Sequence, residues 1–133
     1  MGMNITEQCE FCVTQHESAE HLFFHCTFTA SGLQMVKRWL GWHVKADSLL
    51  SLTRWLGRSK LSRFRKNFFA AVLTGLVYNL WKARNLCVWE KKKLTVAEVF
   101  ERTRSEVLQR VQAIWPKKVS TDDTNWFQNL IVV

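Results

Sequence analysis

Three of the four cysteines lie near the N-terminus, and histidines are interspersed among them. Cys9 and Cys12 form one closely spaced pair and His21 and Cys26 form a second, so the segment reads C-x2-C-x8-H-x4-C. Zinc prefers thiolate and imidazole ligands, and two such pairs allow one ion to clamp both ends of a short loop. The spacing therefore predicts a zinc site whose ligands are Cys9, Cys12, His21 and Cys26.

Two other histidines compete with His21 for the remaining ligand position. His25 directly precedes Cys26, and adjacent side chains rarely turn toward the same ion. His16 leaves only three residues after Cys12, which would require a very tight return to the metal. We therefore favour His21, and the alternatives to a metal site are buried thiols or a disulfide.

Such a zinc site is expected to be structural. Four protein ligands complete the tetrahedral coordination and leave no open position for an activated water. A segment of about 25 residues is too short to build its own core, so the ion would supply its folding free energy, about 10–16 kcal/mol in zinc peptides. His16, His43 and the carboxylates show no spacing that suggests acid–base catalysis, so we expect no enzymatic activity.

Several short segments occur along the chain in an order typical of one protein family. They are Cys9-Glu-Phe-Cys12, Glu17-Ser-Ala-Glu-His21-Leu-Phe-Phe-His-Cys26, Trp39-Leu-Gly and Leu80-Trp81-Lys82-Ala83-Arg84-Asn85. Together they resemble the zinc-binding domain that follows the reverse transcriptase in plant LINE-type non-LTR retrotransposons, over roughly residues 7–115. The resemblance implies the same four zinc ligands and assigns no catalytic residue.

The chain also departs from that family. The family module is attached to a polymerase and is often followed by a ribonuclease H domain, but this sequence contains no Asp-Asp polymerase motif. The resemblance therefore implies either a fragment of a retrotransposon or a short protein derived from one.

The formal net charge of +8 is unevenly distributed along the chain. Residues 1–30 carry four glutamates and no Lys or Arg, whereas residues 31–118 carry all 19 basic residues against five acidic ones. Residues 119–133 add two aspartates. Three thiolates and one Zn²⁺ would make the N-terminal segment still more negative, so we expect a polyanion to contact the basic segment.

Two groups of cations in the basic segment contain few acidic residues. The first places six charges in 13 residues with no carboxylate among them, and the second ends in Lys91-Lys92-Lys93. The predicted nucleic-acid contacts are Arg54, Arg58, Lys60, Arg63, Arg65, Lys66, Lys82 and Arg84. A helix face built only for solubility normally mixes charges of both signs. The alternative is that these cations only solvate outer helix faces.

Two residue types within this segment have competing interpretations. Arg84 either contacts a phosphate or has a structural role, in which it packs on Trp81 or binds a helix end. Trp81, Phe68 and Phe69 recur at helical spacing. We expect these three aromatic residues to lie in the core and not to stack on bases.

The predicted fold is all-α, with a small CCHC zinc-binding head over residues 1–30, a basic body of about four helices over 31–116 and a tail over 117–133. Apolar periodicity predicts a first helix over 31–41 that ends at Gly41. A second helix is expected between an Asp47 cap and Gly57.

The remaining helices are longer. The third is expected from Ser59 to about Glu90, with a wide apolar arc that makes it the central helix. A Thr95-Val-Ala-Glu98 capping box begins the fourth, which Pro116 must end. The tail either docks as a short helix or remains mobile.

The resemblance and the charge distribution together imply a non-catalytic, retrotransposon-derived zinc-binding module that binds RNA or single-stranded nucleic acid through its basic helical body. The alternative is a co-opted protein–protein interaction module with a purely structural zinc. No apolar run is long enough for a membrane span, and neither a membrane partner nor a small-molecule substrate is expected. Ligand-like cysteines without a secretion signal fit a reducing compartment, the nucleus or the cytoplasm.

Overall fold

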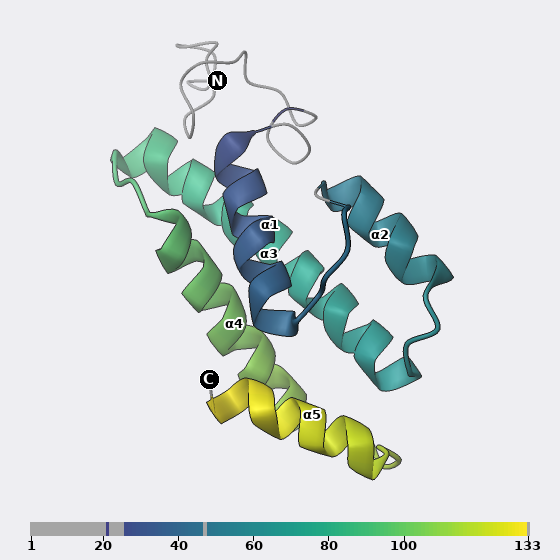
Figure 1. Ribbon diagram of the computed structural model, residues 1–133. Coiled ribbons are helices and arrows are strands. Elements are labelled where there is room, and N and C mark those ends of the chain that lie inside the picture. Colours follow the sequence, from purple (N-terminus) through teal and green to yellow (C-terminus); the bar gives the residue numbers. More distant parts are fainter. Residues whose placement is uncertain (1–20, 22–25, 47, 133) are drawn as a thin grey trace.

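A computed structural model describes residues 21, 26–46 and 48–132 of the protein. The regular structure in these residues is helical, which confirms the predicted all-α class. The elements are α1 (Thr27–Leu40), α2 (Leu49–Arg58), α3 (Arg63–Glu90), α4 (Val96–Ala113) and α5 (Thr121–Val132). Figure 1 shows α3 as the long central helix, with α1 crossing it and α2 and α4 alongside it. Among these elements, no helix has the length and hydropathy needed to cross a membrane.

The central position of α3 follows from its wide apolar arc, as predicted. Its buried apolar residues are Phe68, Phe69, Val72, Leu73, Leu76, Leu80 and Ala83. They face α1, α2 and α4, because each of these helices packs against α3. The side chains of α4 pack closely on α3 at Gly75, where an added Cβ would lie 3.3 Å from Val107 Cγ2 and 3.4 Å from Thr103 Cγ2.

A buried amide joins α3 to α4 beside this close approach. Asn79 is 2% exposed, and its Nδ2 donates to Gly75 O at 3.0 Å, Thr103 Oγ1 at 3.1 Å and Glu106 Oε1 at 3.0 Å. Buried polar groups are costly unless they are hydrogen-bonded. The partners on α4 therefore favour one register between the two helices.

The helix boundaries test the predicted stops and caps. Gly41 ends α1 with a φ of 65°, as predicted, and its N–H donates to Arg38 O, but the helix begins at Thr27 and not at the predicted Ser31. The predicted second helix is present as α2, but its predicted cap and end were wrong: it is capped by Ser48 and continues through Gly57 to Arg58. Asp47, the expected cap, lies outside the described residues.

Serine side chains explain where α2 and α3 begin. Ser48 and Ser51 each accept a backbone N–H of the other, which satisfies donors that a helix start leaves unpaired. The start of α3 is later than predicted, because the side chain of Ser62 accepts the N–H of Arg65 and residues 59–62 form a link.

The capping box of α4 is confirmed. Thr95 N–H donates to Glu98 Oε1 at 2.9 Å, and Glu98 N–H donates to Thr95 Oγ1 at 3.1 Å. The hydrogen bonds that the Thr95 N–H and the Thr95 hydroxyl donate to the Glu98 carboxylate lower the pKa of Glu98. The helix ends at Ala113, before Pro116.

A single lysine holds the segment between α1 and α2. The Nζ atom of Lys37 donates to Val44 O and to Ala46 O, each at 2.7 Å. In the same segment the buried Trp42 packs on Phe69 and on Trp55, with ring centroids 4.7 and 5.5 Å apart. These contacts fix α2 against the first half of α3.

The C-terminal tail docks as α5, which is one of the two arrangements the sequence left open. Phe127 is 1% exposed, and its ring centroid lies 5.6 Å from Phe68, 6.2 Å from Phe64 and 5.1 Å from Trp115. Rings at such distances attract one another beyond the area they bury. An aromatic cluster therefore attaches α5 to α3.

Truncation of Phe127 tests this attachment. We expect Phe127→Ala to lower the free energy of unfolding by about 3–5 kcal/mol, because it empties a fully buried aromatic site. Urea unfolding followed by circular dichroism measures the change. The adjacent Gln128→Ala, at an exposed position of the same helix, should stay within about 0.5 kcal/mol of the parent. Equal effects of the two substitutions would contradict a docked α5.

Candidate nucleic-acid interface

The candidate interface starts from an uninterrupted stretch of positive charge. The eight predicted contacts are all of the Lys and Arg residues between positions 48 and 89, and this stretch contains no Asp or Glu. Consequently α2 and nearly all of α3 have no internal carboxylates to neutralise these cations. Any neutralising group must come from another segment.

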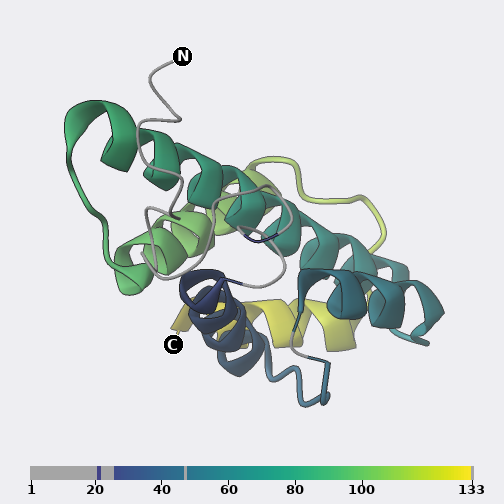
Figure 2. The same ribbon diagram turned by 90° about the horizontal axis from the view of Figure 1, so that it is seen from above.

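The fold separates the eight cations into two groups. Figures 1 and 2 both show α2 beside the N-terminal half of α3, whereas the turn into α4 lies at the opposite end. Six cations lie at the α2 end, and Lys82 and Arg84 lie in the C-terminal half of α3. At 1.5 Å per helical residue, Arg63 and Lys82 are about 28 Å apart. The predicted residues therefore do not form one continuous site.

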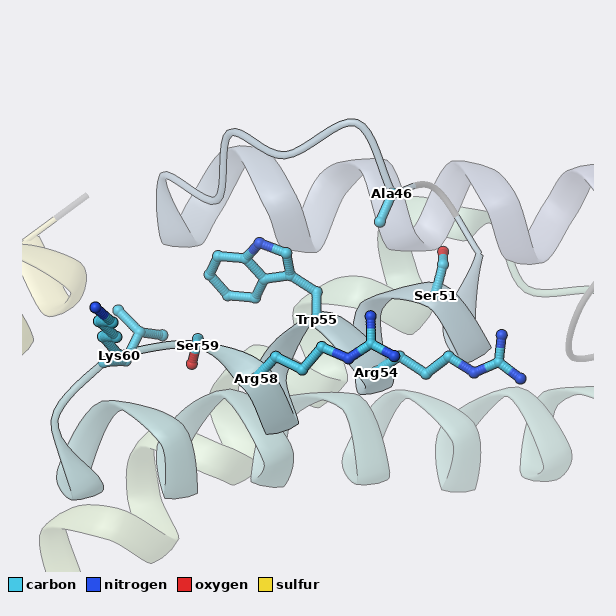
Figure 3. Close-up of a pocket in the computed structure, with 8 residues that line it drawn as sticks. Ala46, Ser51, Arg54, Trp55, Arg58, Ser59 and Lys60 are labelled. Atoms are coloured by element: carbon cyan, nitrogen blue, oxygen red, sulfur yellow. The ribbon is translucent and has the colours of Figure 1, made fainter.

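Four cations of the first group are exposed, and we call them the cationic surface: Arg54, Arg58, Lys60 and Arg63. The first three line an open pocket of about 640 Å³ together with Ala46, Ser51, Trp55, Ser59 and Leu61. In Figure 3 the side chains of Arg54 and Arg58 extend in the same direction, and the Trp55 ring projects from the helix to the other side. The pocket thus combines positive charge for a phosphate with a half-buried indole edge.

Arg65 is held by an intramolecular ion pair. Its Nε donates to Asp123 Oδ1 at 2.8 Å and its Nη2 to Asp122 Oδ2 at 3.2 Å, and its guanidinium carbon lies 4.9 Å from the centroid of the Trp126 ring. All three partners belong to α5. Although Arg65 was predicted as a contact, its charge is already neutralised in the fold. Lys66, the sixth cation of this group, is half-buried.

The second group contributes one exposed cation. Arg84 is only 2% exposed; its guanidinium carbon lies 5.5 Å from the centroid of the Trp81 ring, and its Nη1 donates to Asn85 Oδ1 at 3.2 Å. This position matches the structural alternative given for Arg84 and not direct phosphate contact. Lys82 is exposed, with its Nζ 5.2 Å from the centroid of the Tyr78 ring.

Some aromatic residues of α3 are buried and others are exposed, and the prediction was right for only part of them. Phe68 and Phe69 are buried, as predicted, but the expectation that Trp81 lies in the core was wrong, because Trp81 is 45% exposed. Tyr78 and Trp89 are also exposed, at 58% and 59%. Their spacing in the sequence could have predicted this exposure, because positions 78, 81 and 89 lie on the side of the helix opposite the stripe of buried residues.

Two of the predicted zinc ligands lie within the described residues. His21 and Cys26 are both buried, and Cys26 N–H donates to His21 O at 2.7 Å, so the two ends of the H-x4-C pair are close. Cys26 is also the N-cap residue of α1. These features fit a zinc-binding pair. Cys9 and Cys12 lie outside the described part of the chain, and the described part alone contains no cluster of three potential ligands.

The described residues define a basic all-α domain with a cationic surface at one end of its central helix. Comparisons of the chain with family models, with curated proteins and with solved structures gave no match.

The ion pair between Arg65 and Asp123 predicts a pH dependence. Burial raises the pKa of Asp123, but hydrogen bonds from Ser62, Arg65 and Ser120 and the charge of Arg65 outweigh it, so the pKa is lower than usual. A carboxylate whose pKa is depressed by folding stabilises the fold above its unfolded pKa, about 3.9. That stabilisation is lost as the pH falls through the lower, folded value.

We therefore expect Asp123→Asn to lower the melting temperature at pH 6, and the difference from the parent protein to shrink below about pH 4. Thermal unfolding at a series of pH values measures both. Asp122→Asn is the matched control, because the Asp122 side chain is 91% exposed and its pairing is screened by water. A difference for Asp123→Asn that stays constant from pH 7 to pH 2 would contradict the ion pair.

Proposed function

We propose that this chain is a non-catalytic nucleic-acid-binding module that holds the phosphates of RNA or single-stranded nucleic acid on its cationic surface. One observation carries the proposal: Arg54, Arg58, Lys60 and Arg63 are exposed together at one end of α3, with no carboxylate in residues 48–89. The carboxylates of α5 that approach this end are paired with Arg65.

The chemistry of such a surface is electrostatic. Lys and Arg displace the counterions condensed on a nucleic acid, and binding therefore weakens steeply as salt rises. Four phosphate contacts on a single strand would give a slope of about −2.8 in a plot of log K against log salt. The pocket beside Trp55 adds an indole edge against which a sugar or base can pack.

Charge reversal on the cationic surface tests the proposal. We expect Arg58→Glu with Arg63→Glu to weaken binding to a single-stranded RNA by at least about tenfold and to reduce the salt slope by about 1.4. The matched control is Arg102→Glu with Lys117→Glu, which changes the net charge equally at exposed positions of α4 and the segment after it. Fluorescence anisotropy at several salt concentrations measures both variants.

Two results would contradict this proposal. Equal losses in the two variants would show that net charge alone, and not this surface, determines binding. No measurable affinity of the parent protein even at low salt would favour the alternative, a protein–protein interaction module.

We further propose that the N-terminal segment binds one structural zinc ion through Cys9, Cys12, His21 and Cys26. The C-x2-C and H-x4-C pairs support this, together with the burial of His21 and Cys26 beside the start of α1. The bound ion would supply folding free energy to a segment too short for its own core. The resemblance of this segment supports an origin from the zinc-binding domain of a plant LINE-type reverse transcriptase.

Metal content tests the zinc proposal. We expect about one zinc per chain in the purified protein and in Cys87→Ser, which changes a cysteine of α3, and loss of zinc in Cys12→Ser. Elemental analysis gives the stoichiometry, and thermal unfolding with and without a chelator shows whether the metal stabilises the fold. A zinc-free parent protein as stable as the zinc-treated one would contradict the proposal.

A further inference from the structure

Three large aromatic side chains on the C-terminal half of α3 face solvent. Tyr78, Trp81 and Trp89 are 58%, 45% and 59% exposed. At about 100° per residue, these positions fall on one side of the helix together with Lys82 and Asn85. We call this surface the aromatic face. Large aromatic side chains exposed on one side of a helix are candidates for a contact site.

Cations outnumber carboxylates around the aromatic face, although Glu106 of α4 lines the same pocket as Tyr78 and Lys82. The Nζ atom of Lys82 lies 5.2 Å from the centroid of the Tyr78 ring, and the Arg84 guanidinium carbon lies 5.5 Å from that of Trp81. The exposed Lys91, Lys92 and Lys93 follow Trp89 in the turn. Glu90 is the sole acidic residue in the sequence between positions 48 and 97. The face is therefore complementary to a ligand that is both anionic and aromatic.

This combination selects one kind of ligand. Aromatic side chains stack on unpaired bases of any sequence, while neighbouring cations hold the backbone. In a duplex the bases are already stacked on one another, and double-stranded RNA is recognised through its shape, sugars and phosphates. The chemistry of the aromatic face therefore matches a single strand better than a duplex.

We propose that Tyr78, Trp81 and Trp89 form a base-stacking platform for single-stranded RNA or DNA, with Lys82 and Lys91–Lys93 at the backbone phosphates. The proposal rests on the proposed function and adds a second contact, about 28 Å along α3 from the cationic surface. At a rise of about 3.4 Å per nucleotide, a strand of roughly eight nucleotides spans both contacts.

The experiment compares two probes with the same backbone. One is a single-stranded 12-nucleotide oligomer, and the other is the same oligomer with abasic sites throughout. We expect the protein to bind the base-containing oligomer at least about tenfold more tightly. Trp81→Leu with Trp89→Leu should lower that ratio several-fold and leave the salt slope of the abasic oligomer unchanged, because leucine keeps an apolar helix former and removes the two stacking rings.

Two further variants separate stacking from damage to the fold. Ile114→Ala, at a side chain 69% exposed beyond α4, is the matched control and should preserve the ratio. Tyr78→Leu alone should lower the ratio without disturbing the contact between Arg84 and Trp81. If the tryptophan double variant loses its helical circular dichroism, the ratio measured for Tyr78→Leu alone tests the platform.

The outcomes distinguish the two proposals. A protein that binds neither oligomer contradicts the proposed function and the platform together. A protein that binds both oligomers equally overturns the platform alone and leaves the cationic surface in place. An unchanged ratio in both Tyr78→Leu and the tryptophan double variant also overturns the platform.

Discussion

The central helix α3 must meet two opposing requirements, and the arrangement of the other helices follows from them. Its apolar arc needs cover on several sides, whereas its cations need water or a carboxylate that α3 itself does not contain before Glu90. Cover comes from α1, α2 and α4. The carboxylates come from α5, which pairs with Arg65 while its Phe127 fills the aromatic cluster. Of the other cations of α3, Arg63 at its N-terminal end and Lys82 in its C-terminal half face solvent.

Features with a local physical cause could be predicted from the sequence. The end of α1 at Gly41 and the Thr95–Glu98 capping box each depend on groups within a few residues of one another. The helix α2 was predicted, but its cap and its end were not, for an equally local reason. The reciprocal pair of Ser48 and Ser51 defines the start of the helix, and Gly57 keeps a helical conformation, so that α2 extends to Arg58.

The parts of the candidate site that depend on distant partners could not be predicted. Arg65 finds Asp123 across 58 positions of sequence, and only packing of the tail brings them together. Arg84 was predicted as a phosphate contact and Trp81 as a core residue. Neither prediction was right, because the sequence of a long helix with a wide apolar arc does not show where its buried face ends. Exposure of Arg54, Arg58, Lys60 and Arg63 was easier to anticipate, since hydrated cations without a nearby carboxylate rarely become buried.

The ammonium group of Lys37 connects α1 to the pocket beside Trp55, although Lys37 does not line that pocket. This lysine holds the carbonyls of Val44 and Ala46, and Ala46 forms one wall of the pocket beside Trp55. Neutralising the ammonium, by acetylation or by Lys37→Gln, would weaken its hydrogen bonds to both carbonyls. Ala46 would then be free to move at the edge of the pocket. The shape of the pocket could thus be altered from the opposite side of the segment, with every guanidinium of the cationic surface left intact.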